Sequence, residues 1–161
     1  MESRAKFAGH AIHPMLIVLP LVLLSTAVVF DILHLITDND GFATSSWFMI
    51  AAGIVGGLLA AVFGLVDWLA IPAGTRAKGV GLWHAGGNVV VLLLFVIAWL
   101  LRQDTPAHRP GAAALVLELV ATLVALGSAW LGGELVERLR VGVDEGAHLD
   151  APSSLRAAAN R

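Results

Sequence analysis

Four long apolar stretches constrain this chain more than any other feature. They cover about residues 14–36, 47–71, 82–101 and 112–135. A helix needs about 20 apolar residues to cross roughly 30 Å of hydrocarbon, and lipid offers backbone groups no partner outside a helix. Short connectors rich in Asp, Asn, Gly and Pro separate the stretches, so consecutive helices should run antiparallel. The sequence predicts an all-α fold, a four-transmembrane-helix antiparallel up-and-down bundle.

Composition supports a chain surrounded by a lipid bilayer. Hydrophobic residues make up 58% and charged residues 14%, whereas a soluble domain has about half and a quarter. The chain has no cysteine, which excludes disulfides, thiolate-ligated iron–sulfur clusters and a CxxC redox pair. A net charge of -2 gives no reason to expect nucleic acid as a partner. No Walker loop, dinucleotide fingerprint or nucleophile–base set appears, so we do not expect a hydrolase or a nucleotide-dependent enzyme.

Basic residues divide unequally between the two ends of the predicted bundle. One end would carry eight of the ten, namely Arg4, Lys6, Arg76, Lys78, Arg138, Arg140, Arg156 and Arg161, and the other only Arg102 and Arg109. Cytoplasmic loops are enriched in Lys and Arg, so both termini are predicted to be cytoplasmic. The domain organisation then reads as an N-terminal cytoplasmic segment (1–12), a transmembrane domain (13–140) and a mobile cytoplasmic tail (141–161).

The second apolar stretch has a row of small residues that includes Gly53, Gly57 and Gly64. Small residues four apart let helix backbones approach closely in lipid. Packing inside the bundle is the first interpretation of this row. A homo-oligomer that forms through the Gly53/Gly57/Gly64 face is the second.

Three ionisable residues from separate stretches are predicted to lie at one depth near the cytoplasmic surface. The first and third helices run in the same direction and open near His13 and His84, and the second helix returns Asp67 to the same level. Asn88 follows His84 by one helical turn on the same face. Ionisable groups within membrane spans are costly and rare, so this group calls for an explanation.

A cofactor site is one explanation. The first and third helices of such a bundle lie diagonally, about 11–14 Å apart, which suits a b-type haem held by His13 and His84 as axial ligands. Asp67 and Asn88 would then support the imidazoles. A divalent metal ion is the alternative, with His10, His13, Asp67 and His84 as its ligands. A polar clasp between helices and a proton or solute pathway also remain open.

A second polar group is predicted near the opposite surface. Asp31 and His34 lie late in the first stretch and Glu118 lies early in the fourth. Together they could bind a cation or pass protons. Side chains this close to a surface can also extend into water, and we expect them to do so.

Several of these residues occur together in a spaced pattern that resembles the bacterial membrane family called domain of unknown function 2231. The resemblance covers about residues 10 to 143 and rests on His13-Pro14, Pro20, Asp31, Gly64-Leu65-Val66-Asp67-Trp68, His84, Asn88 and Gly132-Gly133-Glu134-Leu135. It implies four spans in a bacterial inner membrane, and His13, Asp67, His84 and Asn88 as the positions of interest. Some family members are joined to Rieske-type domains, which implies redox work. This chain has no such domain, so a redox role would require a separate partner.

Two functions follow as expectations. The first is a small membrane electron-transfer or cofactor-binding subunit with a redox or membrane protein partner. The second is a non-catalytic membrane scaffold or partner-binding subunit whose polar cluster is structural. A transporter is disfavoured because the spans offer no polar site at the midplane and no pair of broken helices.

Overall fold

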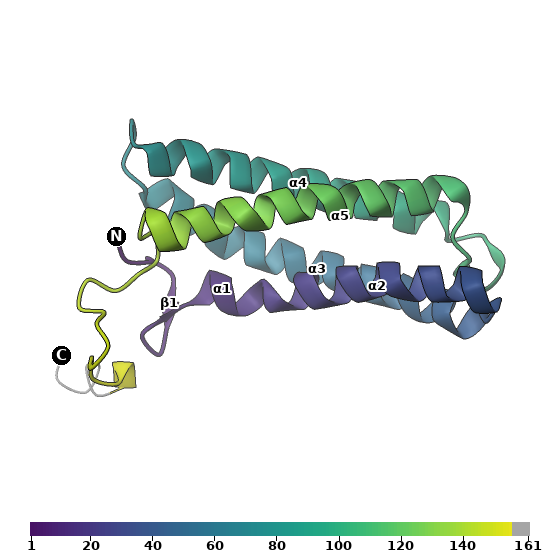
Figure 1. The fold of residues 1–161 in the computed structure, drawn as a ribbon, viewed down its shortest axis with the longest axis horizontal. Helices are drawn as coiled ribbons and strands as arrows, with labels where there is room; N and C mark the ends of the chain where they lie inside the picture. The colour runs from purple at the N-terminus through teal and green to yellow at the C-terminus, as the bar shows by residue number, and fades with distance from the viewer. Residues whose placement is uncertain (156–161) are drawn as a thin grey trace.

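The computed structural model describes residues 1–155, and its helices form the expected antiparallel bundle (Figure 1). The first crossing consists of two consecutive helices, and the three later crossings have one long helix each. Their bounds are α1 (Ile12–Leu16), α2 (Val18–Thr37), α3 (Asp40–Ala70), α4 (Arg76–Leu101) and α5 (Ala112–Gly133). A short 3₁₀ turn, η1 (Pro106–His108), precedes α5, and a π-helical turn, η2 (Glu134–Arg138), follows it. The predicted fold class is confirmed.

Local chemistry explains where the helices begin and break. The Asn39 side chain accepts a hydrogen bond from the Gly41 N–H and so caps α3, and Thr75 caps α4 in the same way. These caps start both helices about two turns earlier than their apolar stretches suggest. Pro20 has no N–H to donate to the carbonyl four residues before it, and this missing bond coincides with the break between α1 and α2.

The outer faces of the helices are apolar at mid-length, as lipid requires. All four crossings are long and apolar enough to span a membrane. Large aliphatic side chains at the middle of the helices are about half exposed or more, among them Val22, Leu58, Val62, Leu93 and Leu123. In water such a surface would be an extensive unpaired apolar patch, whereas lipid covers it at no cost. The chain is therefore an integral membrane protein.

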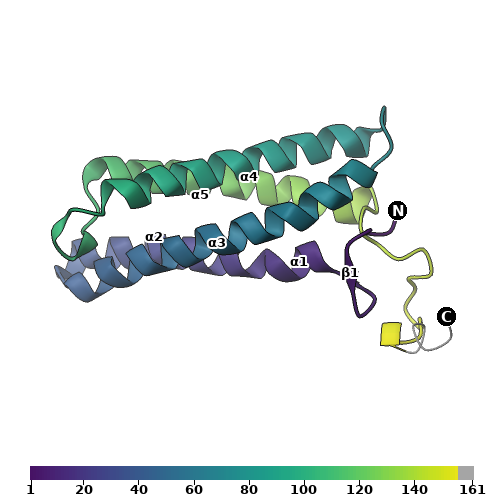
Figure 2. The same ribbon diagram turned by 180° about the vertical axis from the view of Figure 1, so that it is seen from behind.

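The bundle consists of two helical hairpins, α1–α2 with α3 and α4 with α5 (Figures 1 and 2). The buried residues of one hairpin are separated along the chain by the same intervals as those of the other hairpin. In the first helix of each hairpin the repeat pairs Leu24, Ala27 and Asp31 with Phe95, Ala98 and Arg102. In the second helix it pairs Ser46, Ile50, Gly53 and Ala60 with Ala114, Glu118, Ala121 and Ser128.

The glycine row of α3 packs inside the bundle. A Cβ added at Gly53 would meet Leu24 at 2.6 Å, and one added at Gly57 would meet Leu92 at 2.6 Å. A Cβ added at Gly64 would meet the ring of His13 at 2.9 Å. The Gly53/Gly57/Gly64 face thus contacts the other helices of its own chain, which is the first of the two interpretations.

The N-terminal segment lies at one end of the bundle, where a short hairpin precedes α1. Strands β1 (Lys6–Phe7) and β2 (His10–Ala11) pair antiparallel. Ala8 and Gly9 turn the chain between them with φ of 50° and 83°, the left-handed conformation that two-residue hairpin turns require.

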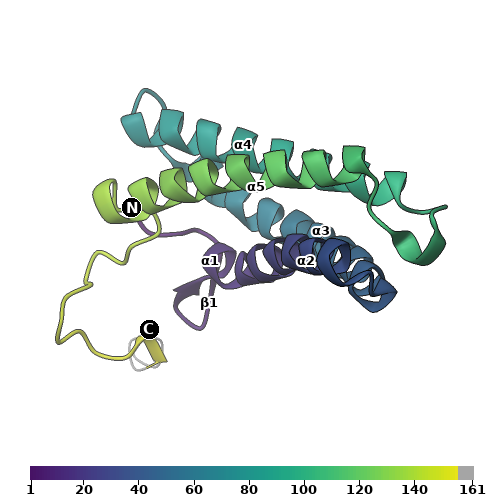
Figure 3. The ribbon, with the colours of Figure 1, turned by 45° about the vertical axis from the view of Figure 1, so that its right-hand side comes forward.

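The chain after η2 returns to this N-terminal segment (Figure 3). The Gly142 N–H donates to the carbonyl of Met1, and the Glu145 N–H donates to Glu2. The ammonium of Lys6 pairs with Glu2 and, together with the bond from Glu145, holds the pKa of that carboxyl below its usual value. Residues 156–161, the end of the predicted mobile tail, lie outside the described residues.

Candidate functional site

A buried ion pair joins the two hairpins at the end of the bundle opposite the N-terminal segment. Arg102 directly follows α4, and its Nη1 and Nη2 donate to Oδ2 and Oδ1 of Asp31 at 2.7 and 2.8 Å. Both side chains have 0% exposure. Such a two-pronged contact matches the planar guanidinium to the carboxylate.

Every N–H of this guanidinium finds an acceptor. Nη1 also donates to Oε1 of Glu118 at 3.0 Å, Nη2 to the carbonyl of Ala43 at 3.1 Å, and Nε to the carbonyl of His108 at 2.9 Å. The hydroxyl of Ser46 donates to Oδ2 of Asp31 at 2.6 Å. Oε2 of Glu118, by contrast, is buried with no hydrogen-bond partner among the described residues.

The expectation that Asp31, His34 and Glu118 extend into water is wrong, because all three side chains are buried. Arg102, which the sequence assigns to a surface loop, brings both carboxylates inside the bundle instead. A signal for this pairing does exist in the sequence, because the spacing from His13 to Asp31 equals that from His84 to Arg102. His34 takes no part in the ion pair, since its Nδ1 bonds to the carbonyl of Asn39 at 3.1 Å.

Two histidines meet near the other end of the bundle, one from each hairpin. His13 lies in α1 and His84 lies about two turns inside α4. Their ring centroids are 6.4 Å apart and the ring planes stand at 88°. The structure therefore brings together the two residues that the sequence singles out as axial ligands.

Each imidazole is oriented by a backbone carbonyl of its own hairpin. Nδ1 of His13 lies 2.8 Å from the carbonyl of Ala60, and Nδ1 of His84 lies 2.8 Å from that of Ser128. A carbonyl can only accept, so Nδ1 is the protonated nitrogen in both rings. The Nε2 lone pair of each neutral ring is then directed away from this bond, which is the form that binds metals.

Each imidazole ring packs against a glycine, where a side chain would leave no room for the ring. A Cβ at Gly64 would lie 2.9 Å from the ring of His13, and one at Gly132 would lie 3.1 Å from that of His84. Gly64 and Gly132 are also equivalent in the repeat. The two half-sites are therefore alike.

Asn88 supports His84 from one turn further along α4. Its Nδ2 donates to the carbonyl of His84 at 2.9 Å and to Oγ of Ser128 at 2.8 Å. Nδ2 also lies 3.3 Å from Nε2 of His84. The two shorter bonds use both amide hydrogens, so the third contact is weak.

Asp67 and His10 have other partners. The carboxylate of Asp67 accepts hydrogen bonds from Oγ of Ser3 at 2.8 Å and from the N–H of Arg4 at 2.8 Å. Nε2 of His10 lies 3.3 Å from Oγ of Ser154. Within residues 1–155, no three His, Asp or Glu side chains gather closely enough to hold a metal ion.

Comparison with known proteins gives the chain a family. The family model described as "Predicted membrane protein (DUF2231)" matches residues 9–145. The chain belongs to the DUF2231 family. No curated protein and no solved structure matches it.

The DUF2231 region contains both polar sites. His13 and His84 lie within it, as do Asp31, Arg102 and Glu118. Chemically the two sites differ. The ion pair is saturated by its own hydrogen bonds apart from one oxygen of Glu118, whereas each histidine of the other site is bonded through Nδ1 to its own hairpin and keeps Nε2 for a ligand.

Proposed function

We propose that this chain is a small membrane electron-transfer subunit that binds a b-type haem between His13 and His84. The observation that carries the proposal is the 6.4 Å separation of the two ring centroids, with both Nδ1 protons committed to carbonyls. His13 and His84 would hold the haem iron through Nε2, the ring nitrogen that each leaves free of its carbonyl bond.

A haem fits this donor set better than a bare divalent ion. A zinc ion in a protein has three or four protein ligands, whereas the described part of the chain brings no three His, Asp or Glu side chains closely enough together to hold a metal ion. A porphyrin brings four nitrogens of its own, so two histidines complete the coordination. When bound, haem supplies a one-electron redox centre, and a separate redox protein would deliver or remove the electron. The chain's own residues fix the imidazole orientation and tautomer.

We place this site near the cytoplasmic side of a bacterial inner membrane. The N-terminal segment lies at the end of the bundle where α1 begins, and His13 belongs to α1 (Figure 1). Most basic residues also belong to this end, among them Arg4, Lys6, Arg76 and Lys78. The enrichment of Lys and Arg in cytoplasmic loops supports this orientation.

An absorption spectrum tests the haem proposal. The chain is produced with ample haem supply and purified in detergent, and we expect a Soret band that His13→Ala and His84→Ala each reduce at least tenfold. His148→Ala is the matched control, because this histidine is exposed and lies outside the bundle. Wild-type protein without a Soret band, or a band that survives both substitutions, would overturn the proposal.

A non-catalytic scaffold is the second candidate, and the buried Arg102 network favours it. This network links the hairpins with hydrogen bonds made almost wholly within the chain, as a structural clasp does. A scaffold predicts that replacement of His13 or Asp67 changes thermal stability or assembly, while no preparation contains haem or metal.

A further inference from the structure

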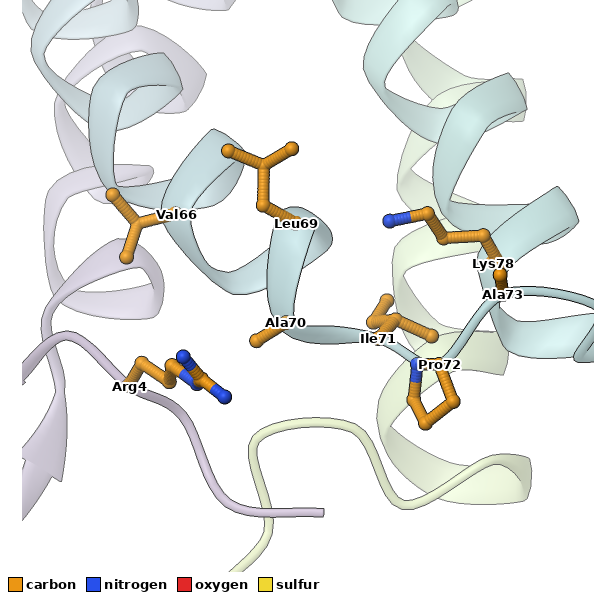
Figure 4. A pocket seen from close by; sticks show the side chains of 8 residues that line it. All are labelled: Arg4, Val66, Leu69, Ala70, Ile71, Pro72, Ala73 and Lys78. Carbon is orange, nitrogen blue, oxygen red and sulfur yellow. The ribbon is translucent and has the colours of Figure 1, made fainter.

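A hollow at the terminal end of the bundle is separate from both polar sites. It has a volume of about 540 Å³ and lies where α3 ends and the loop to α4 begins. Figure 4 shows Arg4 from the N-terminal segment and Lys78 from α4, which reach toward the end of α3 from opposite sides. The other walls are Val66, Leu69, Ala70, Ile71, Pro72 and Ala73.

The charge of this hollow is positive. Arg4 and Lys78 both line it, and none of the other described residues around it is ionisable. The guanidinium of Arg4 is exposed and makes no hydrogen bond to a residue within 1–155. Nζ of Lys78 donates to the carbonyl of Trp68 at 2.7 Å and lies 3.8 Å from the centre of its ring. An ammonium has three donors, so this lysine retains capacity for an anion.

Asp67 holds Arg4 at this position. Its carboxylate accepts from the hydroxyl of Ser3 and from the N–H groups of Arg4 and Ala5. These bonds fix the backbone of the N-terminal segment against α3, with Ser3 buried. Asp67 is therefore a positioning residue, and it presents Arg4 to the hollow without neutralising the guanidinium.

The walls of the hollow continue into the lipid-facing surface of α3. Leu69 is 63% exposed and Val66 is 40% exposed, and Leu65 and Val62 extend the same apolar surface toward the middle of the helix. The hollow lies at the end of a membrane span, the depth at which phosphate groups of lipids are found. A cationic hollow beside an apolar helix face matches a lipid whose headgroup is anionic and whose chains lie along α3.

We propose that this hollow binds the phosphate headgroup of an anionic phospholipid, with Arg4 and Lys78 as its cationic ligands. A zwitterionic lipid binds more weakly, because its ammonium group meets the same two cations. Inorganic phosphate binds more weakly too, because it gains nothing from the apolar walls.

Native mass spectrometry of the full chain in detergent tests this, with phosphatidylglycerol as the probe. We expect phosphatidylglycerol to bind at least about fivefold more tightly than phosphatidylcholine, and Arg4→Gln to remove about fivefold of that affinity. Arg4→Lys should retain most of it. Arg138→Gln is the matched control, because Arg138 is exposed at the same end of the bundle but does not line the hollow. Millimolar inorganic phosphate should not displace the lipid.

Three outcomes would overturn the proposal. Equal loss of affinity in Arg4→Gln and Arg138→Gln would show that only the general charge of this end matters. Displacement by inorganic phosphate would assign the hollow to a soluble anion. Equal binding of the two lipids would show that the cations do not recognise the headgroup.

Discussion

Arg102 shows how a single residue can join two halves of a membrane protein. Its five N–H groups reach Asp31, Glu118 and the carbonyls of Ala43 and His108. Burial of a charge is expensive, and the cost falls only when geometry and hydrogen bonding are nearly complete. Loss of Asp31 would remove the two-pronged contact and leave Arg102 with a single contact to Glu118, and loss of Arg102 would leave two buried carboxylates without a cation.

Asp31→Asn should therefore destabilise the protein much more than Asp40→Asn does. Both aspartates pair with an arginine of the other hairpin, Arg102 and Arg109, but Asp31 has 0% exposure and Asp40 has 43%. We expect a loss of about 3 kcal/mol or more in the free energy of unfolding for Asp31→Asn, and about 1 kcal/mol or less for Asp40→Asn. Equilibrium unfolding in mixed micelles measures both, and equal losses would contradict this account of the buried pair.

At the scale of helices, the sequence predicts the spans well because lipid requires every span to be a helix with an apolar outer surface. The four helices, their antiparallel order and the internal glycine row all follow from that requirement. Contacts between helices follow from rotation and depth, which an apolar pattern does not specify. His13 and His84 meet as expected, whereas Asp67 turns to the N-terminal segment. Arg102 follows the last residue of an apolar stretch, so the apolar pattern places it in a loop.

Gly64 and Gly127 differ in how closely another helix approaches them. At Gly64 a methyl group would lie 2.9 Å from the ring of His13, whereas at Gly127 it would meet nothing within 4 Å. We expect Gly64→Ala to cost about 1–3 kcal/mol, because the ring must leave its bond to Ala60. Gly127→Ala should be neutral or stabilising by up to about 1 kcal/mol, because alanine is the better helix former. Thermal unfolding in detergent compares them, and a destabilised Gly127→Ala would argue against the packing described.

The whole molecule is a pair of similar hairpins that differ in charge where they meet. Equivalent positions hold His13 and His84 at one end, and Asp31 and Arg102 at the other. Like residues at the first pair suit a shared ligand, and opposite charges at the second pair suit an ion pair. Two copies of one hairpin could supply the first arrangement but not the second. The ion pair thus makes the association of unlike hairpins specific.

This specificity predicts that the chain can be divided in the loop around Pro72 and Gly74. Each hairpin spans the membrane with its own helix contacts, so fragments 1–73 and 74–161, produced together, should insert separately and then associate. A tag on one fragment should recover the other from detergent at near-equal amounts. Arg102→Ala should reduce that recovery several-fold, while Arg109→Ala, which removes the exposed pair with Asp40, should leave it nearly unchanged. If both fragments insert but neither recovers the other, then the loop, and not the buried ion pair, holds the two hairpins together.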